Sequence, residues 1–250
     1  MLSMFNLILR IALSLSSPSN GLVTASLKWL NLQDRLNSLH QPLKVLFAAV
    51  GLVALPVFFQ APLVRVFPWV SLVLTALWLG LGLYLMRQPR WQLWGDLLVG
   101  FTWTWLAGSL YWGWLRWEPL VHLPVEALGL PIVAVCLWLG WGRVGSYFYL
   151  GSLLGTAVTD LYTNWMDLFP AWRQLMAVDP EFIPVVLRAA ASSLQTEVAG
   201  GRALLLVVFL LVVGVVPLLS SRQLAWWAFG GAVLSTLVVD GLFFLSASLA

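Results

Sequence analysis

From Lys44 to Ala250 the chain consists of long apolar blocks that contain very few charged residues. Hydrophobic residues make up 61% of the whole sequence and charged residues 9%, and there are 16 tryptophans. This composition leaves too little polar surface to cover a soluble domain, so most side chains must face lipid or other apolar side chains. The sequence therefore predicts an all-helical polytopic membrane protein.

Seven apolar segments are long enough to be predicted as transmembrane helices. They cover residues 44–60, 66–86, 94–114, 122–141, 144–161, 203–220 and 224–246. The first is short and contains Pro56, so a kinked or re-entrant segment is an alternative to a full span. The fourth and fifth are separated only by residues 140–143, whose sequence Gly-Trp-Gly-Arg predicts a tight hairpin.

The positions of the basic residues predict the orientation of these spans. If the N-terminus lies inside, the inner segments carry most of the arginines and lysines, whereas the short outer loops carry only Arg65 and Arg116. We therefore expect the N-terminus inside and the C-terminus outside.

Two domains are expected, an N-terminal arm of residues 1–43 and a transmembrane helical bundle of residues 44–250. Residues 1–16 resemble an interfacial segment more than a cleavable signal peptide, because Arg10 interrupts the apolar run. Apolar residues between positions 25 and 39 follow a helical period and predict an amphipathic interfacial helix, which Gln41-Pro42 should end.

The outer connection of the bundle, residues 162–202, has a helix signal of its own. Asp179 and Pro180 are typical of a helix start and Gly200-Gly201 of a helix stop, which predicts an amphipathic helix over residues 180–199. Its apolar stripe should lie on the outer membrane surface or across the mouth of the bundle.

Four ionisable residues fall at a similar depth near the outer ends of the predicted spans: His122, Glu126, Asp160 and Asp240. A carboxylate in hydrocarbon costs at least about 2.5–3.5 kcal/mol on insertion scales, so such groups usually face a cavity, an opposite charge or a proton. We treat the four as a candidate polar pocket, with Arg116 or Arg173 as counter-charge. The alternative is that each group lies separately at the headgroup level and reaches water.

The chemistry of this candidate pocket has several interpretations. It could relay a proton or a solute, or hold the polar head of a bound molecule. One histidine with carboxylates fits iron or manganese better than zinc, but the chain contains no HExxH or paired Glu-x-x-His motif, so no metal is predicted. Asp96, near Arg87 and Arg90 on the inner side, is expected to form an ion pair or to place its charge at a helix N-terminus.

Tryptophans cluster around the third span, and most of them fit the aromatic belts at the two membrane interfaces. Trp103 and Trp105 instead lie mid-membrane, where they are candidate contacts for a hydrophobic ligand or a partner, with interhelical packing as the alternative. In the fifth span Gly151 and Gly155 form a GxxxG pattern, which predicts close helix packing, more strongly within the chain than between copies.

The sequence contains no GxSxG, Walker A, CxxC or HExxH motif, so it predicts no catalytic residue and an enzyme is the less favoured class. Basic residues are spread singly, which excludes nucleic acid as a partner. We expect a non-enzymatic accessory or assembly factor in the lipid bilayer, one that packs against larger membrane complexes and binds a hydrophobic pigment, quinone or lipid. Two alternatives are a proton-coupled small-solute transporter that uses Glu126, Asp160 and Asp240, and an intramembrane lipid-modifying enzyme with His122 as base.

Two stretches of the chain resemble a family of uncharacterised integral membrane proteins found in cyanobacteria: GDLLVGFTWTWLAGSLYWGWLRWEPLVHLPVEALGLP at residues 95–131 and SYFYLGSLLGTAVTDLYTNWMDLFPAWRQLM at residues 146–176. They contain His122, Glu126 and Asp160, and the resemblance extends over residues 44–248. It implies a photosynthetic host and a thylakoid or plasma membrane. It implies no activity and no catalytic residues.

Overall fold

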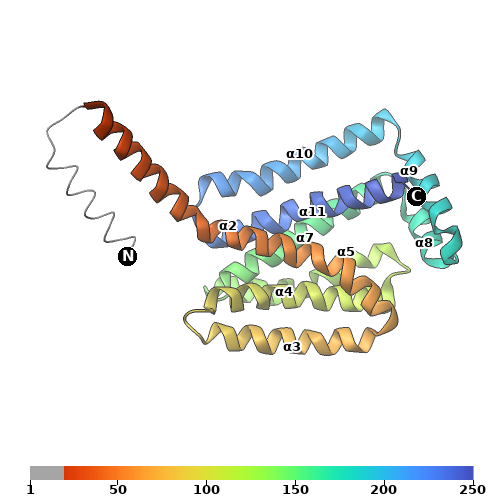
Figure 1. Cartoon of the computed structure of the whole chain (residues 1–250). Helices are drawn as coiled ribbons and strands as arrows, with labels where there is room; N and C mark the ends of the chain where they lie inside the picture. The colour runs from red at the N-terminus through yellow and green to blue at the C-terminus, as the bar shows by residue number, and fades with distance from the viewer. Residues whose placement is uncertain (1–19, 250) are drawn as a thin grey trace. The chain divides into compact units, whose positions relative to one another are not determined.

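The structure, a computed structural model, describes residues 20–249, and every regular element in this range is a helix (Figure 1). The predicted interfacial segment, residues 1–16, lies outside the described residues. The chain divides into two compact units, residues 1–41 and residues 42–250.

The first helix, α2 (Asn20–Val66), contains three prolines along its length: Pro42, Pro56 and Pro62. The prediction that Gln41-Pro42 ends a helix was therefore wrong. An internal proline removes one backbone hydrogen bond, a loss that neighbouring helices and polar side chains can compensate in a membrane bundle. Residues Leu39–Val66 are long and apolar enough to cross a membrane, so this segment is longer than the predicted 44–60. The amphipathic position of residues 25–39 on the membrane stays a prediction.

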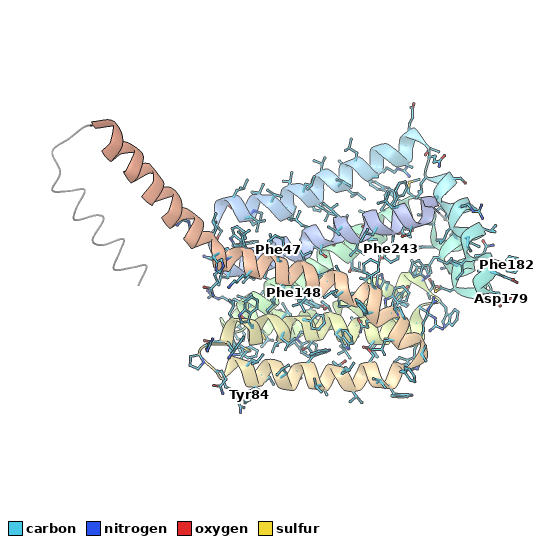
Figure 2. The ribbon with its side chains drawn as sticks, in the orientation of Figure 1. Phe47, Tyr84, Phe148, Asp179, Phe182 and Phe243 are labelled. Atoms are coloured by element: carbon cyan, nitrogen blue, oxygen red, sulfur yellow. The ribbon has the colours of Figure 1, made fainter. Side chains whose placement is uncertain are left out.

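Five further helices form the body of the bundle: α3 (Pro68–Met86), α4 (Gln92–Leu110), α7 (Arg143–Trp165), α10 (Glu197–Ser220) and α11 (Leu224–Leu249). They pack in the order α3, α4, α7, α11 and α10, so that α7 lies between α4 and α11 (Figure 1). Phe148 on α7 is fully buried, whereas Tyr84 on the outermost helix α3 is exposed (Figure 2).

Five segments are long and apolar enough to cross a membrane: Leu39–Val66, Pro68–Met86, Pro119–Trp138, Glu197–Ser220 and Leu224–Ala247. The predicted count of seven is therefore not confirmed. The two remaining predicted spans correspond to α4 and α7, which are rich in glycine and hydroxyl side chains and bury many residues between their neighbours. The position of α4 and α7 in the middle of the bundle explains this composition. Their side chains contact neighbouring helices, which small and hydroxyl side chains allow, whereas helices at the edge of the bundle expose apolar side chains.

Glycines set the close approach of α7 to the helices beside it. A Cβ atom on Gly151 would lie 2.6 Å from the carbonyl oxygen of Phe229 on α11, and one on Gly155 would collide with Thr236. Toward α4, a Cβ atom on Gly100 would collide with the carbonyl of Gly145. The predicted glycine pair thus serves packing within the chain, where small residues let helix backbones meet.

A buried polar network joins α2, α3 and α4 in the interior of the bundle. The Gln60 amide nitrogen donates to the Trp105 carbonyl at 2.6 Å and to the Ser109 hydroxyl at 3.0 Å. The Ser71 and Ser109 hydroxyls lie 2.7 Å apart, and the Trp105 indole donates to the Ser71 carbonyl at 3.0 Å. Because each of these groups has a partner, the network stabilises the packing of three helices where an unpaired polar group would be costly.

The predicted hairpin between the fourth and fifth segments is confirmed. Gly140 and Gly142 have φ angles of 69° and 61°, a left-handed conformation that glycine adopts without strain. Both carboxylate oxygens of Asp96 accept backbone hydrogen bonds at the start of α7, from Val144 at 2.9 Å and Gly145 at 2.8 Å. Asp96 thus places its charge at a helix N-terminus, which was one of the two predictions for it. The helix that it caps is α7, however, and not α4, which carries it.

The connection over residues 162–202 differs from its prediction in two ways. It contains a helix that the pattern did not indicate, α8 (Phe169–Ala177), before η4 (Pro180–Phe182) and α9 (Ile183–Ser193). The glycines at 200 and 201 do not stop a helix, because α10 has already begun at Glu197. The hydroxyl of Thr196 accepts a hydrogen bond from the backbone nitrogen of Ala199 and so caps α10.

We expect Gly151→Ala to lower the free energy of unfolding by about 1–3 kcal/mol, since its new methyl group meets the α11 backbone, which cannot move aside as a flexible side chain would. Gly80→Ala is the matched control, because a Cβ atom at Gly80 has nothing within 4 Å. Reversible unfolding in mixed micelles measures both. A Gly151→Ala protein as stable as Gly80→Ala would contradict the packing role.

Candidate functional site

The centre of the candidate site is a contact between His122 and Asp160. The His122 Nδ1 atom lies 2.9 Å from the Asp160 Oδ1 atom, and the two side chains are 23% and 21% exposed. Asp160 comes from α7 near its C-terminal end, and His122 begins the short helix α5 (His122–Glu126). The pair joins two segments that lie 38 residues apart in the chain.

The segment that carries His122 is a broken helix. It consists of η2 (Pro119–Val121), α5, η3 (Ala127–Gly129) and α6 (Leu130–Trp138). Its prolines cannot donate backbone hydrogen bonds, so a regular ladder of bonds cannot run through the segment. The hydroxyl of Tyr149 on α7 donates to the Glu126 carbonyl at 2.6 Å and satisfies one backbone group beside the break.

The structure brings the other two predicted pocket residues toward the same centre. Glu126 interacts electrostatically with both His122 and Asp160. Asp240 on α11 accepts a hydrogen bond of 2.8 Å from the Thr159 hydroxyl and interacts electrostatically with Asp160. Asp160 is therefore the common neighbour of the group, in direct contact with His122 and at longer range from the two other carboxylates.

Tyr111 belongs to the site although the sequence analysis did not single it out. Its ring centroid lies 4.2 Å from that of His122, with 33° between the ring planes, and the residue is 1% exposed. It begins a π-helix, η1 (Tyr111–Leu115), that continues directly from α4. Such short π-helical segments are rare and often occur at functional sites. Nothing in the residue pattern of this segment distinguishes a π-helix from one more turn of α-helix.

The candidate counter-charges have other partners. Arg173 on α8 forms two hydrogen bonds with the carboxylate of Glu118, at 2.8 and 3.3 Å. Arg116 donates to the Trp112 carbonyl, and its guanidinium lies 4.3 Å from the centroid of the Trp117 ring. Among the ion pairs of the described residues, neither arginine pairs with the His122–Asp160 group. Neither Arg116 nor Arg173 is therefore confirmed as the counter-charge of this group.

The described residues contain no group of three or more His, Cys, Asp or Glu side chains placed to hold a metal ion. Trp105 is buried against Trp78 and Phe101, with its indole nitrogen bonded inside the bundle. Trp103 is half-buried and lies against Gly129 of the broken helix. Of these two tryptophans, Trp103 is thus the one that keeps an accessible surface.

Hydrogen bonds from the Arg173 guanidinium lower the pKa of Glu118. Because the folded protein binds this proton less tightly than the unfolded chain, the pair stabilises the fold above the unfolded pKa, and that contribution is lost as pH falls through the lowered value. We expect the melting temperature of Glu118→Gln to lie slightly below that of the wild type at neutral pH. The difference is small because the pair is exposed, and in acid the two proteins should melt at the same temperature. Melting temperatures across a pH series measure this. A difference that grows on acidification would contradict it.

Comparison with known proteins identifies a family for the chain. The model of a family described as "Protein of unknown function (DUF3120)" matches residues 49–248. No curated protein and no solved structure matches the chain. The family match contains the broken helix, the π-helix and the whole ionisable group, and it confirms the expected resemblance to an uncharacterised family. The chain therefore belongs to the DUF3120 family of proteins of unknown function.

Proposed function

We propose that the protein is a proton-coupled carrier of a small solute, with the His122–Asp160 pair as its proton-binding site. The observation that carries the proposal is the 2.9 Å contact between these two side chains, with Glu126 and Asp240 in electrostatic range of the same carboxylate. Ionisable residues in a membrane bundle are costly to bury and typically mark ion pathways or proton relays.

The chemistry of the pair suits this role. Histidine changes charge near neutral pH, so an imidazole beside a carboxylate can take up and release a proton under physiological conditions. Glu126 and Asp240 offer further carboxylates to which a proton or a cationic solute can pass. The Thr159 hydroxyl, bonded to Asp240, adds a neutral polar group beside them.

The broken helix also supports a carrier. Interrupted helices in transporters bring backbone groups and charged side chains together at the substrate site. Here the interruption carries His122 and Glu126, and η2 and η3 lie at the two ends of α5. The glycine and proline residues that produce the interruption therefore have a function besides packing, which is to place these side chains beside α7.

We propose further that α4 and α7 also cross the membrane, which gives seven spans with the N-terminus inside. Their 19 and 23 residues correspond to about 28 and 35 Å of helix, close to the thickness of a hydrocarbon core. With this topology the ionisable group lies near the outer face. The resemblance to cyanobacterial proteins supports a thylakoid or plasma membrane as the location.

Flux measurements in liposomes test the carrier. A panel of amino acids, carboxylates, sugars and inorganic ions is added singly to proteoliposomes that contain a pH-sensitive dye. We expect one solute class to drive a proton flux, and Asp160→Asn to reduce that flux about tenfold or more, because the amide cannot bind the proton. Asp167→Asn, the same chemical change in the turn after α7, should retain the flux.

The carrier would be contradicted by a panel in which no solute raises the flux above that of empty liposomes. It would also be contradicted by an Asp160→Asn protein that transports as the wild type does.

A second candidate function is that of an accessory protein of larger membrane complexes that binds a hydrophobic pigment, quinone or lipid. Its support is an apolar depression of about 250 Å³ on α3, lined by Trp69, Val70, Val73 and Leu74. Trp69 is 71% exposed, and its ring lies 5.3 Å from that of Trp114. Exposed indole faces suit flat ring systems.

Purification in mild detergent followed by mass spectrometry of bound pigments, quinones and lipids tests this second function. We expect a ring-containing lipid or cofactor to co-purify with the wild type and to be lost from Trp69→Ala, whose apolar depression lacks its indole wall. Trp138→Ala, which removes another highly exposed indole, should retain it. Equal content in the wild type and Trp69→Ala would count against the site.

A further inference from the structure

The helix α8 lies across one end of the bundle, and none of its residues is buried (Figure 1). It packs against α9, and its Trp172 attaches it to the segment beside the candidate site. The indole nitrogen of Trp172 donates to the Arg116 carbonyl at 2.9 Å, and its ring packs 5.7 Å from that of Trp112. Both partners belong to the π-helix and the residue after it, so α8 is docked on the segment that positions Tyr111.

An exposed ion pair, and a contact of 3.6 Å between the Arg65 guanidinium and the Met176 sulfur, also attach α8. Arg173 of α8 binds the carboxylate of Glu118 through two nitrogens, and both side chains are 44% exposed. Glu118 directly precedes the broken helix, where its carboxylate also accepts a hydrogen bond from the Leu120 backbone. The pair therefore ties α8 to the segment that carries His122.

The backbone on either side of α8 leaves the helical conformation. Asp167, just before α8, has a φ angle of 53°, and no other non-glycine residue among those described has a positive φ. Val178, just after α8, is extended, with φ −79° and ψ 154°. Hinges are usually a few loop or element-terminal residues that absorb backbone changes, and these two positions are of that kind.

The contacts of α8 lead directly to the candidate site. Trp172, Trp112, Tyr111 and Val125 pack in one apolar cluster, and the Tyr111 ring stacks on His122. If α8 moved away, Trp172 would leave this cluster and the outer side of Tyr111 would be uncovered. His122, whose side chain is 23% exposed in this structure, would then lose the cover of a buried ring and become more exposed.

We propose that α8 is a gate over the outer side of the His122–Asp160 site, closed in this structure, with the Glu118–Arg173 pair as its latch. The identity of the solute or ion that passes the gate rests on the proposed function, whereas the movement of α8 does not. The latch is exposed and ionic, so its strength depends on salt, and an exposed pair is weak enough to open without unfolding the bundle.

Chemical modification of His122 by diethylpyrocarbonate reports the opening. The chain contains two histidines, so a His40→Gln parent leaves His122 as the one modifiable imidazole, and peptide mass spectrometry gives its rate. We expect Arg173→Gln to be modified roughly fivefold faster than the parent, because its latch is missing. Arg188→Gln is the matched control, since Arg188 is an exposed arginine bonded within its own helix α9.

Two further measurements make the result specific. The double variant Glu118→Arg with Arg173→Glu restores an ion pair of opposite polarity and should return the rate toward that of the parent. Raising the salt concentration should speed modification of the parent and leave Arg173→Gln unchanged. A rate in Arg173→Gln equal to that of the parent, or an equal increase in Arg188→Gln, would overturn the gate.

The gate and the carrier can fail separately. Modification of His122 requires no transported solute, so a latch-dependent rate in a protein without solute-driven proton flux would retain the gate and refute the carrier. A solute-driven proton flux, together with a His122 modification rate that does not depend on the Glu118–Arg173 pair, would retain the carrier and refute the gate.

Discussion

The arrangement of this bundle depends on how closely α7 approaches the helices on either side. Gly155 contacts Thr236 on α11, and one turn further along both helices the Thr159 hydroxyl bonds to Asp240. The close glycine contact and the hydrogen bond to Asp240 thus lie one turn apart along the same interface between α7 and α11. If a larger side chain separated these helices, the carboxylate would lose its hydroxyl partner, so the geometry of the ionisable group is a consequence of the packing.

Much of this could be predicted from the sequence, because the relevant signals are local or depend on depth. A GxxxG spacing indicates a close helix contact, and a Gly-Trp-Gly turn indicates a hairpin, whatever the rest of the chain does. Similar predicted depth in the membrane also suggested that His122, Glu126, Asp160 and Asp240 form one group. Depth does not give the direction of a side chain around its helix, so the direct partner of Asp160 could be identified only from the structure.

Other features depend on contacts between distant segments and have no local signal. Gln60 looked like the end of a short span, yet its amide lies inside the bundle because Ser109 and the Trp105 carbonyl are there to meet it. The π-helix at Tyr111 and the helix α8 share this property, since each is stabilised by the other across more than 50 residues. A pattern of hydrophobic residues along one segment cannot report such pairs.

The Gln60 network has a consequence for how the protein is built. Membrane helices enter the bilayer one after another, and a helix that arrives with an unpaired amide has reason to remain close to water or to the insertion machinery. The partners of Gln60 lie on α3 and α4, which are synthesised later. The side chain of Gln60 therefore obtains its hydrogen-bond partners only after both later helices have been synthesised.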